Sequence, residues 1–202
     1  MSLIKIFTGV TFEKLFLKHN FGHQTYKSHK NPLLIGIGGF GKVLKYEWKD
    51  SGLTVALKCL KADTIVDEKI IKDFIYELKL LQSVSNHQNV ISFYGVTKDS
   101  DGYYNMVLQY ADDGTLREYL ITNFTKLQWT DKLYIAKEIA LGLLYLHDNN
   151  IIHRDLHSKN ILIHQRQPKI TDFGLSRQIN EITSNSNLHG MPASGLAMDY
   201  VQ

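Results

Sequence analysis

Three side chains in the second half of the chain, Asp155, Asn160 and Asp172, have the types and spacing that phosphoryl transfer requires. Asp155 ends a His-Arg-Asp string, and Asp172 begins an Asp-Phe-Gly string. One carboxylate could orient a hydroxyl nucleophile, while the amide and the second carboxylate could hold Mg²⁺ on a nucleotide. The alternative is a loop with ordinary solvated charges, and the motifs upstream argue against it.

Residues 36–43 form a glycine-rich segment that fits the pattern G-x-G-x-x-G-x-V. Glycines let backbone amides approach phosphate oxygens because no side chain stands in the way. Dinucleotide-binding folds use a similar pattern, but there the last glycine opens a helix. Here Val43 begins an alternating run typical of a strand, so we predict a hairpin that covers the phosphates of a nucleotide.

Lys58 follows Val-Ala-Leu in the next predicted strand. An ammonium group in a largely apolar strand is costly unless it is paired; an exposed lysine on an edge strand is the alternative. Glu77 lies at the border of the apolar stripe of the following helix, where it could reach inward. Glu68, near the polar start of that helix, is better placed to pair with Lys72 at i+4. We therefore expect a Lys58–Glu77 ion pair that holds the inner phosphates.

The hydrophobic pattern predicts a strand-rich first half and a helical second half. Strands are expected near residues 33–35, 43–48, 53–58, 90–97 and 103–110. A helix capped by Asp63 should place its apolar stripe on Ile71, Phe74, Ile75, Leu78 and Leu81. Further on, the pattern predicts a short helix from Gly114, a long helix over 130–149, and a hairpin of 161–163 with 169–170. The long helix should be buried along Leu133, Ile135, Ile139, Leu143, Leu144 and Leu146.

The composition argues against several classes of function. The net charge of +3 comes without a Lys/Arg block, which disfavours nucleic-acid binding. Cys59 is the only cysteine, so no intrachain disulfide can form and a reducing, cytoplasmic location is expected. No apolar run reaches the ~18 residues that a membrane helix needs, so no membrane association is predicted. Residues 1–30 are expected to be an N-terminal extension; the alternative is a metal site on His19, His23 and His29.

Together these motifs resemble those of eukaryotic protein kinases over roughly residues 31–192, and most closely those of the tyrosine-kinase-like group. The resemblance implies an α+β, two-lobed fold. Residues 31–110 would form a nucleotide-binding N-lobe with a small antiparallel sheet and one helix, and residues 111–202 an incomplete helical C-lobe. The resemblance also implies ATP and Mg²⁺ as cofactors, and transfer of the γ-phosphoryl group to a protein substrate.

The resemblance assigns roles to individual residues. The catalytic group would consist of Lys58, Glu77, Asp155 and Lys159, and the Mg²⁺ ligands would be Asn160 and Asp172. ATP would be bound by Ile35, Gly36, Ile37, Gly38, Gly39, Phe40, Gly41, Lys42, Val43, Ala56, Lys58, Gln109 and Ala111. Val43 and Ala56 would enclose adenine, with Gln109 and Ala111 binding it through the backbone. Leu108 would be the gatekeeper, and Leu81, His153 and Phe173 would stack between the lobes.

The class of substrate depends on the positions that follow Asp155. Serine/threonine kinases usually have a lysine two residues after the catalytic Asp, where this chain has His157. Tyrosine kinases often have an arginine four residues after it, where this chain has Lys159. A cation at either position can neutralise charge on the transferring phosphoryl group. Many tyrosine-kinase-like proteins modify serine and threonine, so Ser/Thr is expected over Tyr.

The match to the kinase pattern ends in the last residues of the chain. Thr183, Ser184 and Ser186 lie in the expected activation loop as candidate sites for an upstream kinase, and the match is lost from Ser194. The helix at 130–149 would then lack packing partners. Leaving several hundred Å² of apolar surface exposed, at ~25 cal/mol per Å², would forfeit on the order of 10 kcal/mol of stability. An unstable lower lobe is therefore expected. The alternative function is an inert, ATP-binding regulatory or decoy module.

Overall fold

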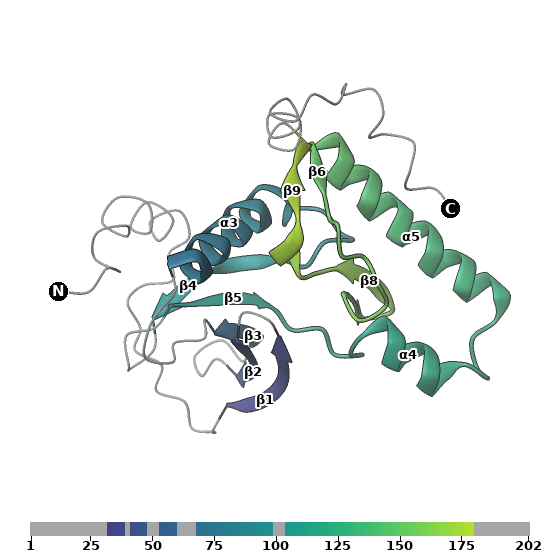
Figure 1. Cartoon of the computed structure of the whole chain (residues 1–202). Coiled ribbons are helices and arrows are strands. Elements are labelled where there is room, and N and C mark those ends of the chain that lie inside the picture. Colours follow the sequence, from purple (N-terminus) through teal and green to yellow (C-terminus); the bar gives the residue numbers. More distant parts are fainter. Residues whose placement is uncertain (1–31, 39–40, 48–52, 60–67, 99–103, 180–202) are drawn as a thin grey trace.

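The structure, a computed structural model, describes residues 32–38, 41–47, 53–59, 68–98 and 104–179. Five antiparallel strands form one sheet in the order β1-β2-β3-β5-β4 (Figure 1). The strands are β1 Leu33–Gly38, β2 Gly41–Glu47, β3 Thr54–Cys59, β4 Phe93–Lys98 and β5 Tyr104–Gln109. The expected start of the fourth strand at Val90 is wrong, because Val90 forms a parallel bridge with Ile170 instead.

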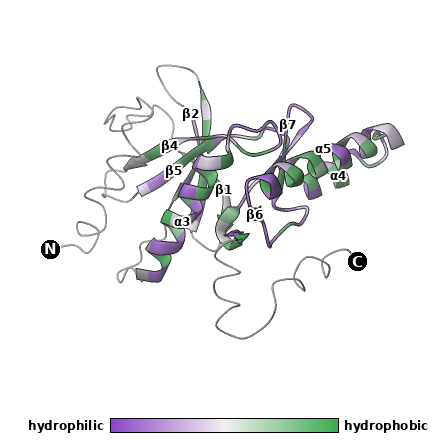
Figure 2. Cartoon of the chain, turned by 90° about the horizontal axis from the view of Figure 1, so that it is seen from above, coloured by the Kyte–Doolittle hydropathy of each residue, from purple (hydrophilic) through white to green (hydrophobic). Residues whose placement is uncertain are grey.

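Helix α3, Glu68–Val84, packs against this sheet and is amphipathic. Figure 2 shows apolar and polar residues alternating along it. Phe74, Leu78 and Leu81 are buried with Met106 of β5 in the main core, and Ile75 packs against them. The expected cap Asp63 and the side chain of Ile71 lie outside the described part.

The described part of the second half contains both helices and short strands. Its elements are α4 Leu116–Asn123, α5 Trp129–Asp148, β6 Ile151–Ile152, β7 Ile161–His164, β8 Gln167–Ile170, a 3₁₀ turn Phe173–Leu175 and β9 Arg177–Gln178. Thr115 caps α4: its hydroxyl accepts the N–H of Glu118, whose carboxylate accepts the N–H of Thr115. The expected α+β, two-lobed fold is thus confirmed. No helix in the described ranges has the length and apolar content that crossing a membrane requires.

The predicted burial of the long helix is wrong at two positions. Leu133 and Leu144 are 52% and 56% exposed, whereas Ile135 and Leu146 are buried. Within the described residues, α5 packs against β6, β8 and α4 along one side only, so an apolar stripe wider than that side is left in contact with water.

Gly142 of α5 lies against two buried neighbours, Asn89 and Ile170. A Cβ at this position would lie 2.9 Å from Cβ of Asn89 and 2.9 Å from Cδ1 of Ile170. Because both neighbours are buried, they have little room to move, so we expect Gly142→Ala to lower the free energy of unfolding by about 1–3 kcal/mol. Urea unfolding measures the change. Helix preference alone would raise stability by roughly 0.5–1 kcal/mol, so a more stable variant would contradict the close approach.

Candidate active site

Lys58 lies at the centre of a buried ion-pair network. Its Nζ is 2.6 Å from Oε1 of Glu77 and 3.0 Å from Oδ1 of Asp172. The side chains of Lys58 and Glu77 are 10% and 1% exposed. The Lys58–Glu77 pair expected from the sequence is therefore present. Asp172, which is 114 residues away from Lys58 in the sequence, joins the same network.

The secondary structure explains why these groups meet. Lys58 lies in β3, opposite Val43 of β2 and Met106 of β5. Residues i, i+3, i+4 and i+7 share one face of a helix, so Glu77 of α3 points to the same side as the buried Phe74 and Leu81. That side faces the sheet, and the carboxylate therefore reaches the lysine from the inner face of α3.

The protonation of the pair follows from burial and charge. Burial alone would lower the pKa of Lys58, but the charges of Glu77 and Asp172 outweigh it, so this pKa is raised. Burial raises the pKa of the Glu77 carboxyl, while the Lys58 ammonium opposes that shift. Because the lysine has two carboxylates within 3.0 Å, we assign the ammonium–carboxylate form. Each charge in this pair depends on its partner, since an unpaired buried charge is strongly destabilising.

A second network orders the loop that carries Asp155. Asn160 donates through Nδ2 to both the backbone oxygen and Oδ2 of Asp155, at 2.9 Å each. The N–H of Asp155 donates to Nδ1 of His153 at 3.3 Å, and Nε2 of His153 lies 2.9 Å from the carbonyl of Thr171. Burial lowers the pKa of His153, which favours the neutral ring with one donor and one acceptor nitrogen. The ring thus links the loop to the residue that precedes Asp172.

Backbone conformation is unusual at one residue in each of these two segments, as it also is at Asn150, Gln165 and Arg166 outside them. Arg154 and Asp172 have φ angles of 67° and 62°, in the left-handed region that non-glycine residues rarely adopt. Such strain costs on the order of 1–3 kcal/mol per residue and concentrates at functional sites. Here it accompanies the contact between the Asp172 carboxylate and Lys58.

Asn160 and Asp172 supply oxygen atoms of the kind that Mg²⁺ prefers. Nδ2 of Asn160 donates to Asp155, so Oδ1 of Asn160 is the atom that could bind a cation. Asp172 contacts Lys58 through Oδ1, which leaves Oδ2 of Asp172 for a cation. The N–H of Thr171 donates to the carbonyl of Asn160 at 3.0 Å, so the backbone connects the two candidate ligands. No group of three or more Asp, Glu, His or Cys side chains that could hold a metal occurs in the described residues. The donor set therefore fits a Mg²⁺ ion that phosphate oxygens also bind.

The glycine-rich segment forms the predicted hairpin. Gly36 pairs with Val43, and Gly38 pairs with Gly41, across β1 and β2. Gly41 has a φ angle of 149°, a conformation that favours glycine. Ile35, Ile37 and Lys42 are exposed along this hairpin. Gly39 and Phe40 lie outside the described residues.

The residues expected around adenine lie on β2, β3 and the segment after β5. Ala56 is buried, and Val43 packs against the same core. Gln109 donates its N–H to the carbonyl of Ser92 at 2.9 Å, so its own carbonyl is the group that could bind adenine. Ala111 is half-buried. These positions are compatible with the expected nucleotide site.

His153 and Phe173, which were expected to stack between the lobes, are in contact, but their rings are tilted rather than stacked. The rings of His153 and Phe173 lie 5.3 Å apart at an interplanar angle of 59°. Phe173 and Leu81 belong to the same buried cluster, which also includes residues of the sheet. The core therefore runs continuously from the sheet to the loop that carries Asp172.

Sequence reasoning missed several groups that order the site. Thr171 acts through its backbone carbonyl, and Ser176 donates from Oγ to the carbonyl of His153 at 3.1 Å. A backbone acceptor has no side-chain signature, so no pattern could identify it. In the sequence, His157 stands out only because it occupies the position where serine/threonine kinases usually have lysine. In the structure its Nε2 lies 3.8 Å from Oδ1 of Asp155. Lys159 is exposed, and its N–H donates to Nδ1 of His157.

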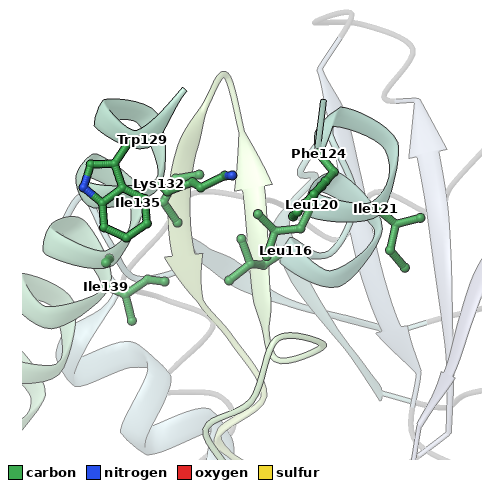
Figure 3. Close-up of a pocket in the computed structure, with 9 residues that line it drawn as sticks. Leu116, Leu120, Ile121, Phe124, Trp129, Lys132, Ile135 and Ile139 are labelled. Atoms are coloured by element: carbon green, nitrogen blue, oxygen red, sulfur yellow. The ribbon is translucent and has the colours of Figure 1, made fainter. Parts of the chain in front are cut away.

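A separate apolar groove lies between α4 and α5 (Figure 3). It has a volume of about 810 Å³ and is lined by Leu116, Leu120, Ile121, Phe124, Trp129, Lys132, Ile135, Ala136 and Ile139. None of these residues belongs to the candidate ATP or metal site. The groove is therefore a feature of the helical packing surface rather than of the nucleotide site.

Comparison with known proteins agrees with this geometry. Residues 30–200 match the family model described as protein tyrosine and serine/threonine kinase. The chain belongs to this kinase family. It is also 37% identical over 147 residues to LIM domain kinase 1 of Drosophila melanogaster, a match that covers 72% of this chain and 11% of that protein. The chain thus spans about a tenth of the length of this relative. Kinases of this family generally use ATP and Mg²⁺, and both acidic strings of the site lie inside the matched range.

Proposed function

We propose that this chain is the catalytic part of a protein kinase that transfers the γ-phosphoryl group of ATP to a protein hydroxyl. The observation that carries the proposal is the position of Lys58, within 3.0 Å of both Glu77 and Asp172. An active kinase needs both the lysine–glutamate pair and the metal-binding aspartate in place. Residues 31–110 and 111–202 then act as the nucleotide lobe and the catalytic lobe.

Each candidate residue has a distinct task in this reaction. Lys58, oriented by Glu77, binds the inner phosphates of ATP. Asn160 and Asp172 hold Mg²⁺, which neutralises charge on the phosphates when it is bound. Asn160 fixes Oδ2 of Asp155, so Oδ1 orients the substrate hydroxyl and accepts its proton. Lys159 adds positive charge near the transferring group.

We infer that serine and threonine are preferred over tyrosine. The inference depends on the catalytic-loop string from His153 to Asn160, which resembles that of the tyrosine-kinase-like group. Phosphoamino-acid analysis of a labelled generic substrate tests it. Mainly phosphotyrosine in the product would contradict it.

Transfer itself is tested by incubating the purified chain with Mg-ATP and a generic protein substrate. We expect phosphate incorporation that stops when EDTA removes Mg²⁺ and falls by roughly 10²-fold or more in Asp172→Ala, because metal and phosphates lose a ligand that fixes their geometry. Nucleotide binding is followed in parallel by thermal shift. ATP binding without transfer would contradict the proposal, and loss of both would argue against a functional nucleotide site.

A second candidate function is a regulatory or decoy module that binds ATP without transferring phosphate. The observation that favours it is the bare apolar surface of α5, where Leu133 and Leu144 are exposed. Such a surface is a site for association or aggregation. The assay above separates the two functions, because only the kinase incorporates phosphate.

We propose that an upstream kinase phosphorylates Thr183, Ser184 or Ser186; these three residues lie outside the described part. We also propose a cytoplasmic location, because a chain with a single cysteine, Cys59, cannot form an intrachain disulfide.

A further inference from the structure

Glu138, in the middle of α5, is a buried carboxylate outside the site described above. The residue is 6% exposed. Its Oε2 accepts hydrogen bonds from Gln88 Nε2 at 3.3 Å, Asn89 Nδ2 at 3.0 Å and Gln167 Nε2 at 2.6 Å. A buried carboxylate is costly unless hydrogen-bonded, and these three amides satisfy its Oε2. The hydrogen bonds from Asn89 and Gln167 lower the pKa of Glu138, which keeps it charged.

The three donors come from two segments that lead to the active site. Gln88 and Asn89 lie in the loop that follows α3, the helix that carries Glu77. Gln167 begins β8, which ends two residues before Asp172. Glu138 therefore connects α5 to both segments with a single oxygen atom.

The loop and β8 are also bonded to each other. The N–H of Ile170 donates to the carbonyl of Asn89 at 2.7 Å, and the N–H of Ile91 donates to the carbonyl of Ile170 at 2.9 Å. Asn89 Nδ2 donates to the carbonyl of Pro168 at 3.2 Å, and Lys169 Nζ donates to the carbonyl of Gln88 at 2.8 Å. The position of one segment therefore determines the position of the other.

Gly142 brings α5 close to this junction. It lies one helical turn after Glu138, and a Cβ there would be 2.9 Å from both Asn89 and Ile170. The helix backbone thus lies directly against the loop and β8, which Figure 1 shows beside α5. The absence of a side chain at Gly142 thus permits this close approach, and Glu138 is hydrogen-bonded to both segments.

We propose that Glu138 is a positioning residue that orients Asp172 and Glu77 relative to each other through these amide hydrogen bonds. The inference rests on the proposed kinase function. Without the carboxylate, Asn89 and Gln167 lose their shared acceptor, and β8 is free to shift against the loop after α3. A displacement of about 1 Å at reacting groups can cost 10²-fold in rate. The effect should therefore fall on kcat rather than on the KM for ATP.

The test compares Glu138→Leu, Glu138→Asp and Glu138→Gln with Asp148→Asn, which changes an exposed carboxylate of the same helix. Glutamine keeps one carbonyl oxygen that can accept the amides, whereas leucine has none and aspartate is one methylene too short. At a temperature where circular dichroism shows each variant folded, we expect kcat to fall roughly 10- to 100-fold in Glu138→Leu and in Glu138→Asp. Glu138→Gln should keep at least a third of the wild-type kcat, and Asp148→Asn should match the wild type.

Three outcomes are distinguishable. The inference would be overturned if the wild-type chain transfers phosphate and folded Glu138→Leu or Glu138→Asp has the same kcat. The carboxylate would then contribute only to stability. An equal loss of kcat in Glu138→Gln and Glu138→Leu would overturn it as well. No transfer by the wild-type chain would overturn the proposed function and this inference together. If Glu138→Leu does not fold, the comparison of Glu138→Asp with Glu138→Gln decides the question.

Discussion

Replacing Lys58 by methionine is expected to abolish detectable phosphoryl transfer and to lower the free energy of unfolding by about 3–5 kcal/mol. Transfer is lost because the inner phosphates lose their cation. Stability falls because Glu77, 1% exposed, keeps a buried carboxylate without its partner at 2.6 Å. Urea unfolding and the phosphate-incorporation assay measure the two effects. Lys79→Met, at an exposed position of α3, is the control and should stay within about 0.5 kcal/mol of the wild type.

A double variant separates the two effects of Lys58. Lys58→Met combined with Glu77→Leu removes both charges, and replacing a buried ion pair by apolar groups is often neutral for stability. The double variant should therefore regain most of the lost stability while remaining inactive. A double variant that is as unstable as Lys58→Met would show that the unpaired carboxylate is not the cause.

The stability of Lys58→Met should also depend on pH. Burial raises the pKa of Glu77, and the variant has no ammonium group at this position to oppose that shift. A carboxyl group whose pKa is raised in the folded state favours folding while protonated, and this contribution is lost as pH rises through the folded-state pKa. The deficit of Lys58→Met should thus grow from acidic toward neutral pH. A deficit independent of pH would argue against an uncompensated carboxylate.

Replacing Asp155 by asparagine is expected to lower kcat by roughly 10²- to 10⁴-fold, the range typical of a lost general base. Asparagine keeps the shape of the side chain, and an amide oxygen can still accept the Nδ2 donor of Asn160. Folding and ATP affinity should therefore change little, since the Asp155 side chain is 38% exposed. Single-turnover kinetics with thermal-shift titration of ATP measures both properties. Asp148→Asn is again the control, and a variant with wild-type kcat would show that another group orients the hydroxyl.

Sequence patterns predicted the structure correctly where the contacts are local, or where hydrophobic periodicity indicates which face of a helix is buried. The short helix α4 and the hairpin of β7 and β8, both predicted from the sequence, arise from residues close together in the chain. The Lys58–Glu77 pair spans 19 positions, yet the stripe of α3 already indicated that Glu77 could reach inward. The burial prediction failed at Leu133 and Leu144, because periodicity shows that a face is apolar but not whether another element covers it.

The types of the reacting groups were thus determined by the sequence, through a lysine, carboxylates and an amide at recognisable spacing. Their relative positions were decided only by the tertiary structure. Lys58 meets Asp172 across 114 positions, and β6 pairs with β9 through two residues on each strand, too few for a periodic signal. The junction of Glu138 with Asn89 and Gln167 joins three separate segments through side-chain amides. Hydrogen bonds of this kind depend on how the segments pack together, and no single segment carries a pattern that predicts them.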